Sequence, residues 1–217
     1  MNEPIVKDII TDIEALGEWS IEINPKKEGP LCQEIILNLK ATMREKGLVS
    51  LTAPQIGYNK KIMCVKFGKD DYRTMINPMI DHVSNIQFAR EKCSSIPGKE
   101  FIRPRFATIR VLYVTPLGAY ESRMVNGLSA YVIQHCIDHL EGLLLSDVGL
   151  EIDELWDQAS EDERTEVLKA YAESLDIKLK NLQTEISQDK DLSQLNDAIN
   201  FIASVKSGET QLERPEN

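Results

Sequence analysis

A chain of 217 residues with 42% hydrophobic content is long enough to bury one good core and a helical appendage. Its formal net charge of -10 argues against binding nucleic acid or an anionic membrane through a broad positive surface. No apolar run reaches the roughly 18 residues of a membrane span, and charged residues crowd the N-terminus, so we expect a cytoplasmic protein with four reduced cysteines.

The first predicted element is a helix at residues 30–46, where apolar side chains recur at helical spacing and Gly47 supplies the stop. A turn-rich segment follows it. Strands are then predicted at residues 61–67 and 75–76 from their β-branched, aromatic and apolar content. A further strand at residues 107–114 alternates polar and apolar side chains, as a half-buried strand does. Short strands therefore precede the helix that comes next.

That central helix is predicted at residues 127–140, with Gly142 placed to terminate it. Beyond it the composition shifts toward Glu, Asp, Lys and Gln, and residues 160–163 (SEDE) have the form of a capping box that opens a long helix. Its apolar stripe from Leu168 to Ile186 can pack on the chain's own core or pair with a second copy in a homodimer.

We therefore expect a principal domain over residues 1–150 and an acidic helical extension over residues 151–217. A second amphipathic run is predicted near residues 195–202, and the terminus at 207–217 is predicted to fray. Three further side chains are given no role in a site. Cys32 and Cys64 are predicted to be buried in apolar runs, and His82 is predicted to face solvent in a loop.

The hexapeptide QHCIDH at residues 134–139 places two of the chain's three histidines four residues apart. Side chains at i and i+4 share one helical face, so His135 and His139 can aim both imidazoles at one metal ion. Metallohydrolases with this arrangement usually carry a glutamate base after the first histidine, and this chain has Cys136 there. The pattern predicts a metal site whose usual base is missing.

Three segments in order resemble the fingerprint of the peptide deformylase family, whose motifs run roughly GxGLAAPQxG, EGCLS and QHExDH. Here they are LVSLTAPQIG at residues 48–57, EKCSS at 91–95 and QHCIDH at 134–139. The resemblance covers roughly residues 31–147, and three motifs in order are far more specific than one. It implies an α+β fold with mostly antiparallel sheets around a central metal-bearing helix, followed by the acidic C-terminal helical extension.

The resemblance also implies roles for individual residues. Cys93, His135 and His139 fall on the family's three metal-ligand positions, and a thiolate with two neutral imidazoles suits one divalent ion, Fe(II) or Zn(II). Gln55 falls where the family's glutamine donates a hydrogen bond to the developing oxyanion, next to the backbone N–H of Ser94. A fourth coordination position would be left for water.

Cys136 is the departure with the largest predicted consequence. In the family, the glutamate at this position moves a proton from the metal's water to the leaving amine. A thiol has a pKa of about 8.5 and a shorter reach, so losing this acid–base help predicts a rate lower by roughly 10²–10⁴. Three interpretations of Cys136 stay open: plain packing, a fourth ligand of a closed structural zinc site, and a redox-sensitive thiol beside the metal. Two carboxylates, Glu91 and Asp138, fall on positions that orient ligands or anchor loops.

The residues expected around the substrate also depart from the family. Leu48, Ser50 and Lys92 stand where the family has glycines, and Ser94 replaces a leucine. The predicted substrate-binding residues are Val49, Ser50, Lys92 and Arg105. A polar Ser94 and a cationic Lys92 favour a smaller, more polar or anionic ligand than a formyl-methionyl peptide. Arg105 is equally consistent with a surface ion pair.

Two functions from different classes fit these motifs. The first is a metallohydrolase that removes a formyl group from an N-formylated peptide, or from a smaller formylated or acylated amide, with impaired or altered activity. Gln55, Ser94 and Cys136 are its predicted catalytic residues. The second is a non-catalytic protein of the same fold that binds metal and a peptide or protein partner.

Overall fold

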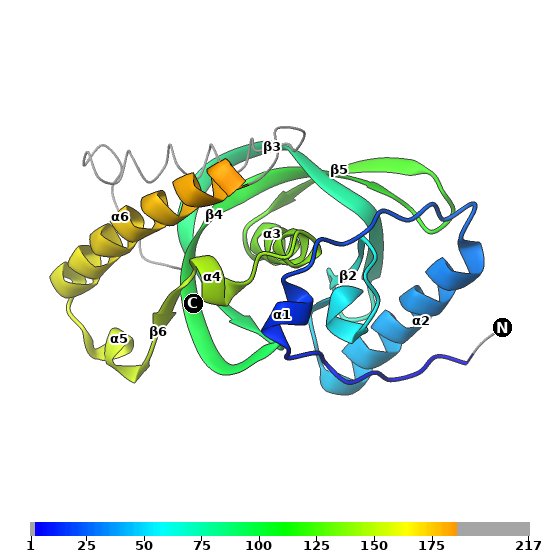
Figure 1. The fold of residues 1–217 in the computed structure, drawn as a ribbon, viewed down its shortest axis with the longest axis horizontal. Coiled ribbons are helices and arrows are strands. Elements are labelled where there is room, and N and C mark those ends of the chain that lie inside the picture. Colours follow the sequence, from blue (N-terminus) through cyan, green and yellow to red (C-terminus); the bar gives the residue numbers. More distant parts are fainter. Residues whose placement is uncertain (1–2, 186–217) are drawn as a thin grey trace. The chain divides into compact units, whose positions relative to one another are not determined.

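The computed structural model describes residues 3–185 of the chain, with side chains through Leu175 (Figure 1). In chain order the elements are α1 (Ile13–Leu16), α2 (Gly29–Lys46), β1 (Ser50–Thr52), η1 (Pro54–Ile56), β2 (Ile62–Lys66), β3 (Tyr72–Cys93), β4 (Ile96–Val114), β5 (Tyr120–Asn126), α3 (Leu128–Leu140), α4 (Leu145–Val148), β6 (Leu150–Ile152), α5 (Glu154–Gln158) and α6 (Glu161–Glu185). The strands join in the order β1-β2-β3-β4-β5, with β6 pairing with β4. The pairs β1–β2, β2–β3, β4–β5 and β4–β6 are antiparallel, which confirms the predicted α+β class. Among residues 3–185 no helix is both long and apolar enough to cross a membrane.

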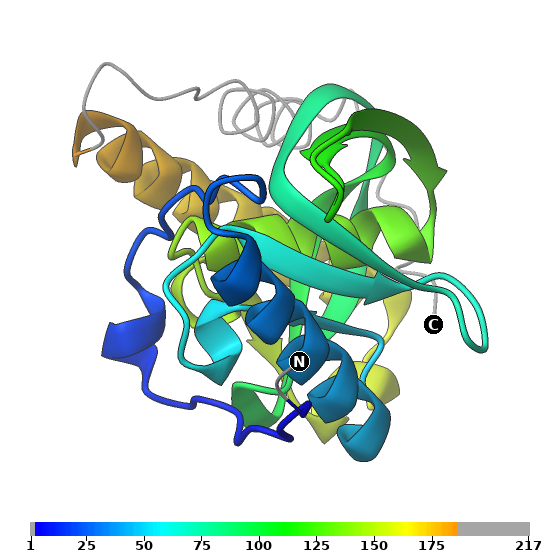
Figure 2. The same cartoon turned by 90° about the vertical axis from the view of Figure 1, so that its right-hand side faces the viewer.

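The helix α2 forms where the sequence predicts it, within one residue at its start. Pro30 lies in its first turn, and Gly47 ends it with a φ of 67°, a left-handed conformation that costs glycine little. Ile35, Leu39 and Met43 are spaced by four residues and all fully buried, so they share one face. The helix contacts β1 and β2, and it is the blue helix at the front of the view in Figure 2.

The helix α3 matches the predicted central helix and contacts β1, β2 and β5 (Figure 1). It is buried on more than one face. Its buried residues are Ala130, Ile133, Gln134, Cys136, Ile137, His139 and Leu140. The chain leaves the helix through Gly142, whose φ is 70° and where a Cβ would collide with the backbone of Gly17. Both the backbone conformation and the lack of space therefore require glycine at this predicted stop.

The strands β3 and β4 are far longer than the sequence predicted. The strand signal at 75–76 belongs to a strand that continues to Cys93, and the signal at 107–114 belongs to one that begins at Ile96. Asn77 and Asn85 interrupt β3 with φ values of 47° and 54°, which break the two-residue alternation that sequence patterns detect. The prediction of a loop around His82 is wrong, because this residue lies in β3, although it is exposed as predicted.

Compactness divides the described chain into two units. The first comprises residues 3–85, Ser94–Pro97 and Phe106–Leu144, and it holds two hydrophobic clusters, one of them built around α3 and the other around α2. The second combines Ile86–Cys93 and Gly98–Arg105 with residues 145–185. The predicted domain boundary between residues 150 and 151 stays a prediction.

In the second unit, α6 opens with the predicted capping box. The Ser160 N–H donates to the Glu163 carboxylate at 2.8 Å, and the Glu163 N–H donates back to the Ser160 hydroxyl at 3.3 Å. Further along the helix, the Tyr171 hydroxyl donates to the carbonyl of Val148 at 2.6 Å, and its ring packs against Phe88.

The apolar stripe of α6 is therefore buried within its own chain over the part that the structure describes, where Leu168, Tyr171 and Leu175 are all buried. The remaining stripe positions, from Leu179 to Ile186, have side chains outside the described residues. The homodimer stays a prediction, and the predicted elements at 195–202 and 207–217 also lie outside the described residues.

Candidate metal centre

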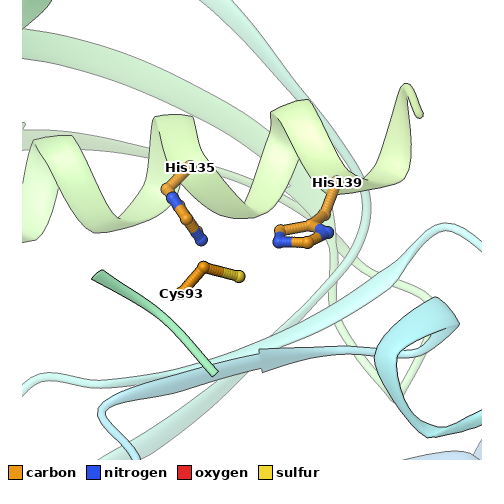
Figure 3. A group of neighbouring side chains, drawn as sticks. All are labelled: Cys93, His135 and His139. Carbon is orange, nitrogen blue, oxygen red and sulfur yellow. The ribbon is translucent and has the colours of Figure 1, made fainter. Parts of the chain in front are cut away.

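Two imidazoles and one thiol converge at the centre of the predicted site. His135 and His139 stand on successive turns of α3 with ring centroids 5.0 Å apart, and Cys93 is the last residue of β3 (Figure 3). The sulfur and one ring nitrogen from each histidine all lie within 4.8 Å of one another. This confirms that the three predicted ligands form one group.

The chemistry and burial of this group fit a divalent transition metal. Cys93 and His139 are buried and His135 is partly buried, so one side of the group stays accessible. A buried thiolate loses its hydration, and a bound cation compensates for that loss. One sulfur and two nitrogens suit zinc or ferrous iron and leave a coordination position for water. Among the side chains that the structure describes, at residues 3–175, this is the one group of three with metal-site spacing.

Gln134, which the sequence analysis left without a role, ties α3 to β4. Its side-chain oxygen accepts from the Phe106 N–H at 3.0 Å, and its amide nitrogen donates to the Phe106 carbonyl at 2.8 Å. The same nitrogen donates to the carbonyl of Ala130 at 3.0 Å. Gln134 therefore completes the backbone pairing of Phe106 and fixes α3 one residue before its first metal ligand. The sequence did contain a signal for this role, because Gln134 is a polar residue on the predicted buried face of an apolar helix.

Glu91, which lies two residues before Cys93, forms a buried, bidentate ion pair with Arg105. Arg105 Nε donates to one carboxylate oxygen of Glu91 at 2.5 Å, and Nη2 donates to the other at 3.0 Å. The Glu91 side chain is only 8% exposed and the Arg105 side chain only 3%. Of the two predicted roles for Arg105, the ion pair is present, but it is buried rather than on the surface. Its contact with substrate stays a prediction.

The Gln55 side chain makes hydrogen bonds within the first motif and from the first motif to the second. Its side-chain oxygen accepts from the Thr52 N–H at 3.0 Å and from the Thr52 hydroxyl at 3.1 Å. Its amide nitrogen donates to the hydroxyls of Ser94 at 3.3 Å and Ser95 at 3.1 Å. Sequence reasoning missed Thr52 and Ser95. Ser95 is the last residue of the second motif, where its match to the family's serine was the available signal.

Cys136 packs among apolar side chains. It is 1% exposed and belongs to the same hydrophobic cluster as Ile133 and Ile137. It is not a member of the metal-ligand group found in the described part of the chain. This burial favours the packing interpretation over the closed four-ligand zinc site, and the role of Cys136 stays a prediction.

Three of the predicted substrate-binding residues lie on β1 or β3 or directly before β1, and they differ in exposure. Val49 is exposed and Ser50, the first residue of β1, is partly buried. The Lys92 side chain is 74% exposed, and its ammonium lies 3.8 Å from a carboxylate oxygen of Glu100. This neighbouring negative charge weakens the attraction that Lys92 exerts on an anion. The roles of all three in binding substrate stay predictions.

Two cysteines away from the metal group are buried, as predicted. Burial raises the pKa of the Cys64 thiol to about 11, and burial together with the nearby Glu28 raises the pKa of Cys32. At pH 8, a thiol with the pKa of Cys64 is ionised in roughly one molecule in a thousand. We expect Cys64 to resist iodoacetamide in the native protein, measured by mass spectrometry of its peptide. The same protein in guanidinium should label rapidly, and labelling at equal rates in both states would contradict the prediction.

Comparison with known proteins agrees with this geometry. The family model described as polypeptide deformylase matches residues 8–153. The chain is 36% identical over 120 residues to the peptide deformylase of Thermosynechococcus vestitus. This alignment covers 53% of this chain and 64% of that protein, slightly less than two thirds of the relative's length. It is 30% identical over 146 residues to that of Dictyoglomus thermophilum, covering 66% of this chain and 95% of that protein. Among solved structures, a peptide deformylase from Legionella pneumophila gives a TM-score of 0.60 at 25% identity, covering 84% of this chain and 100% of that chain. Because the matched span contains Cys93, His135 and His139, and the metal-site geometry is intact, the chain belongs to the polypeptide deformylase family.

Proposed function

We propose that this chain is a metal-dependent amide hydrolase that removes a formyl group from N-formylated peptides or smaller formylated amides, with turnover limited by Cys136. The observation that carries the proposal is the convergence of Cys93, His135 and His139 within 4.8 Å in a chain of this family. Cys93, His135 and His139 would hold a divalent ion, which would supply Lewis-acid chemistry and activate water.

The remaining chemistry falls to the chain's own residues. The family resemblance gives Gln55 the role of an oxyanion donor, and its amide nitrogen here donates to the Ser94 and Ser95 hydroxyls, so Gln55 fixes the turn that follows Cys93. The backbone N–H of Ser94, next to the ligand Cys93, is the second donor that the family resemblance implies. What the chain lacks is a carboxylate at position 136 to move a proton to the leaving amine, which supports slow rather than absent turnover.

The burial of Cys136 also favours a second candidate, a non-catalytic protein that binds metal and a peptide. A thiol buried in the same apolar cluster as Ile133 and Ile137 is poorly placed to carry protons. On this alternative, the metal group stabilises the fold, and a peptide binds without being hydrolysed.

Formate release separates the two candidates. Protein loaded with one equivalent of Fe(II) or Zn(II) is incubated with N-formyl-Met-Ala, with a small formylated amide, and with an acidic formylated peptide. We expect slow formate release above that of free metal, and none from His139→Ala, which lacks one metal ligand. Saturable peptide binding with no formate release would favour the non-catalytic candidate. If neither formate release nor binding occurs in metal-loaded protein, both candidates are wrong.

A further inference from the structure

The Gln55 amide can adopt only one orientation. The backbone nitrogen of Thr52 is a donor and never an acceptor, so the atom of Gln55 that faces it at 3.0 Å has to be the carbonyl oxygen. The amide nitrogen then faces the two-residue turn Ser94–Ser95, which connects β3 to β4. Both serine hydroxyls accept hydrogen bonds from this nitrogen.

A serine hydroxyl that accepts from an amide N–H must direct its own proton elsewhere. The two serines differ in where that proton can go. Ser95 is 1% exposed, so its hydroxyl is enclosed by protein, whereas Ser94 is partly exposed and directly follows the metal ligand Cys93. Of the two, Ser94 is therefore the hydroxyl that a ligand at the metal group can reach.

We propose that the Ser94 hydroxyl donates a hydrogen bond to the carbonyl oxygen of the formyl group, and that Gln55 acts on the substrate through Ser94. This inference rests on the proposed function. The hydrogen bond that Ser94 receives from Gln55 polarises its O–H and makes it a better donor. A leucine at this position, which the family motif carries, has no hydroxyl to offer. Ser94 thereby favours a formyl or other small acyl oxygen over an unacylated amine.

The test compares peptide binding to zinc-loaded full-length protein by calorimetry, using N-formyl-Met-Ala and its unformylated counterpart Met-Ala. The loss of one hydrogen bond predicts that Ser94→Ala binds the formylated peptide about tenfold more weakly and Met-Ala unchanged. Ser94→Thr keeps a hydroxyl and should bind both peptides as the native chain does. Ser95→Ala is the matched control, because it removes the other serine hydroxyl that Gln55 contacts.

The outcomes distinguish this inference from the proposed function. If Ser94→Ala and Ser95→Ala weaken formylated-peptide binding equally, or if Ser94→Ala weakens both peptides equally, Ser94 only supports Gln55 and the inference is overturned. If the native chain prefers the formylated peptide and Ser94→Ala retains that preference, the inference fails and the proposed function stands. If the native chain binds neither peptide, the proposed function fails and the inference fails with it.

Discussion

Replacing Cys136 with glutamate is expected to raise the rate of formate release from N-formyl-Met-Ala by roughly 10²–10⁴, because it restores general acid–base help at the family's position. The longer side chain has to leave the apolar cluster in which Cys136 is buried, since an unpaired carboxylate there would be costly. We expect it to extend toward the metal group, in which His135 is only partly buried. The measurement is kcat/KM of metal-loaded protein, with metal content determined for each preparation.

Cys136→Gln is the matched control for this substitution. It brings nearly the same volume and polarity into the cluster but cannot accept and release a proton at neutral pH. We expect it to show no gain in rate. A gain in Cys136→Gln equal to that in Cys136→Glu would show that space, and not proton transfer, limits turnover. No gain in either variant, with full metal content, would favour the non-catalytic candidate.

Replacing Arg105 with methionine is expected to lower the free energy of unfolding by about 3–5 kcal/mol, because it leaves the Glu91 carboxylate buried without its two-pronged partner. The measurement is denaturant unfolding of protein with and without metal. Since Glu91 lies two residues before Cys93, we also expect weaker metal binding, measured by competition with a chelator.

The double variant Glu91→Gln with Arg105→Met tests the cause of that loss. It removes both charges together, so the cost of an uncompensated buried charge disappears. We expect it to be more stable than Arg105→Met alone. Glu91→Gln alone is measured in the same way. If its loss of unfolding free energy simply adds to that of Arg105→Met in the double variant, the two side chains act independently, and the buried ion pair is not what stabilises this region.

The local elements and the metal ligands of this protein could be predicted from the order of its residues. The helix α2 follows from apolar residues four apart and a terminal glycine, and both features act within a single turn. His135 and His139 share a face because helix geometry requires it, and three motifs in order identified Cys93 as the third ligand. Structure that depends on interactions among a few neighbouring residues can therefore be predicted from the sequence pattern.

The supporting network could not be predicted, because its partners are far apart in the chain. Gln55 reaches Ser94 and Ser95 across about 40 positions, as the 39- and 40-residue separations of these hydrogen bonds show. For the same reason, the sequence predicted a surface ion pair for Arg105, whereas the structure has a buried one, since burial depends on everything packed around a side chain. The lengths of β3 and β4 also depended on pairing in the sheet, which satisfies backbone groups even where Asn77 and Asn85 interrupt the alternation. Burial and partner choice are properties of the folded chain, and no window of neighbouring residues contains them.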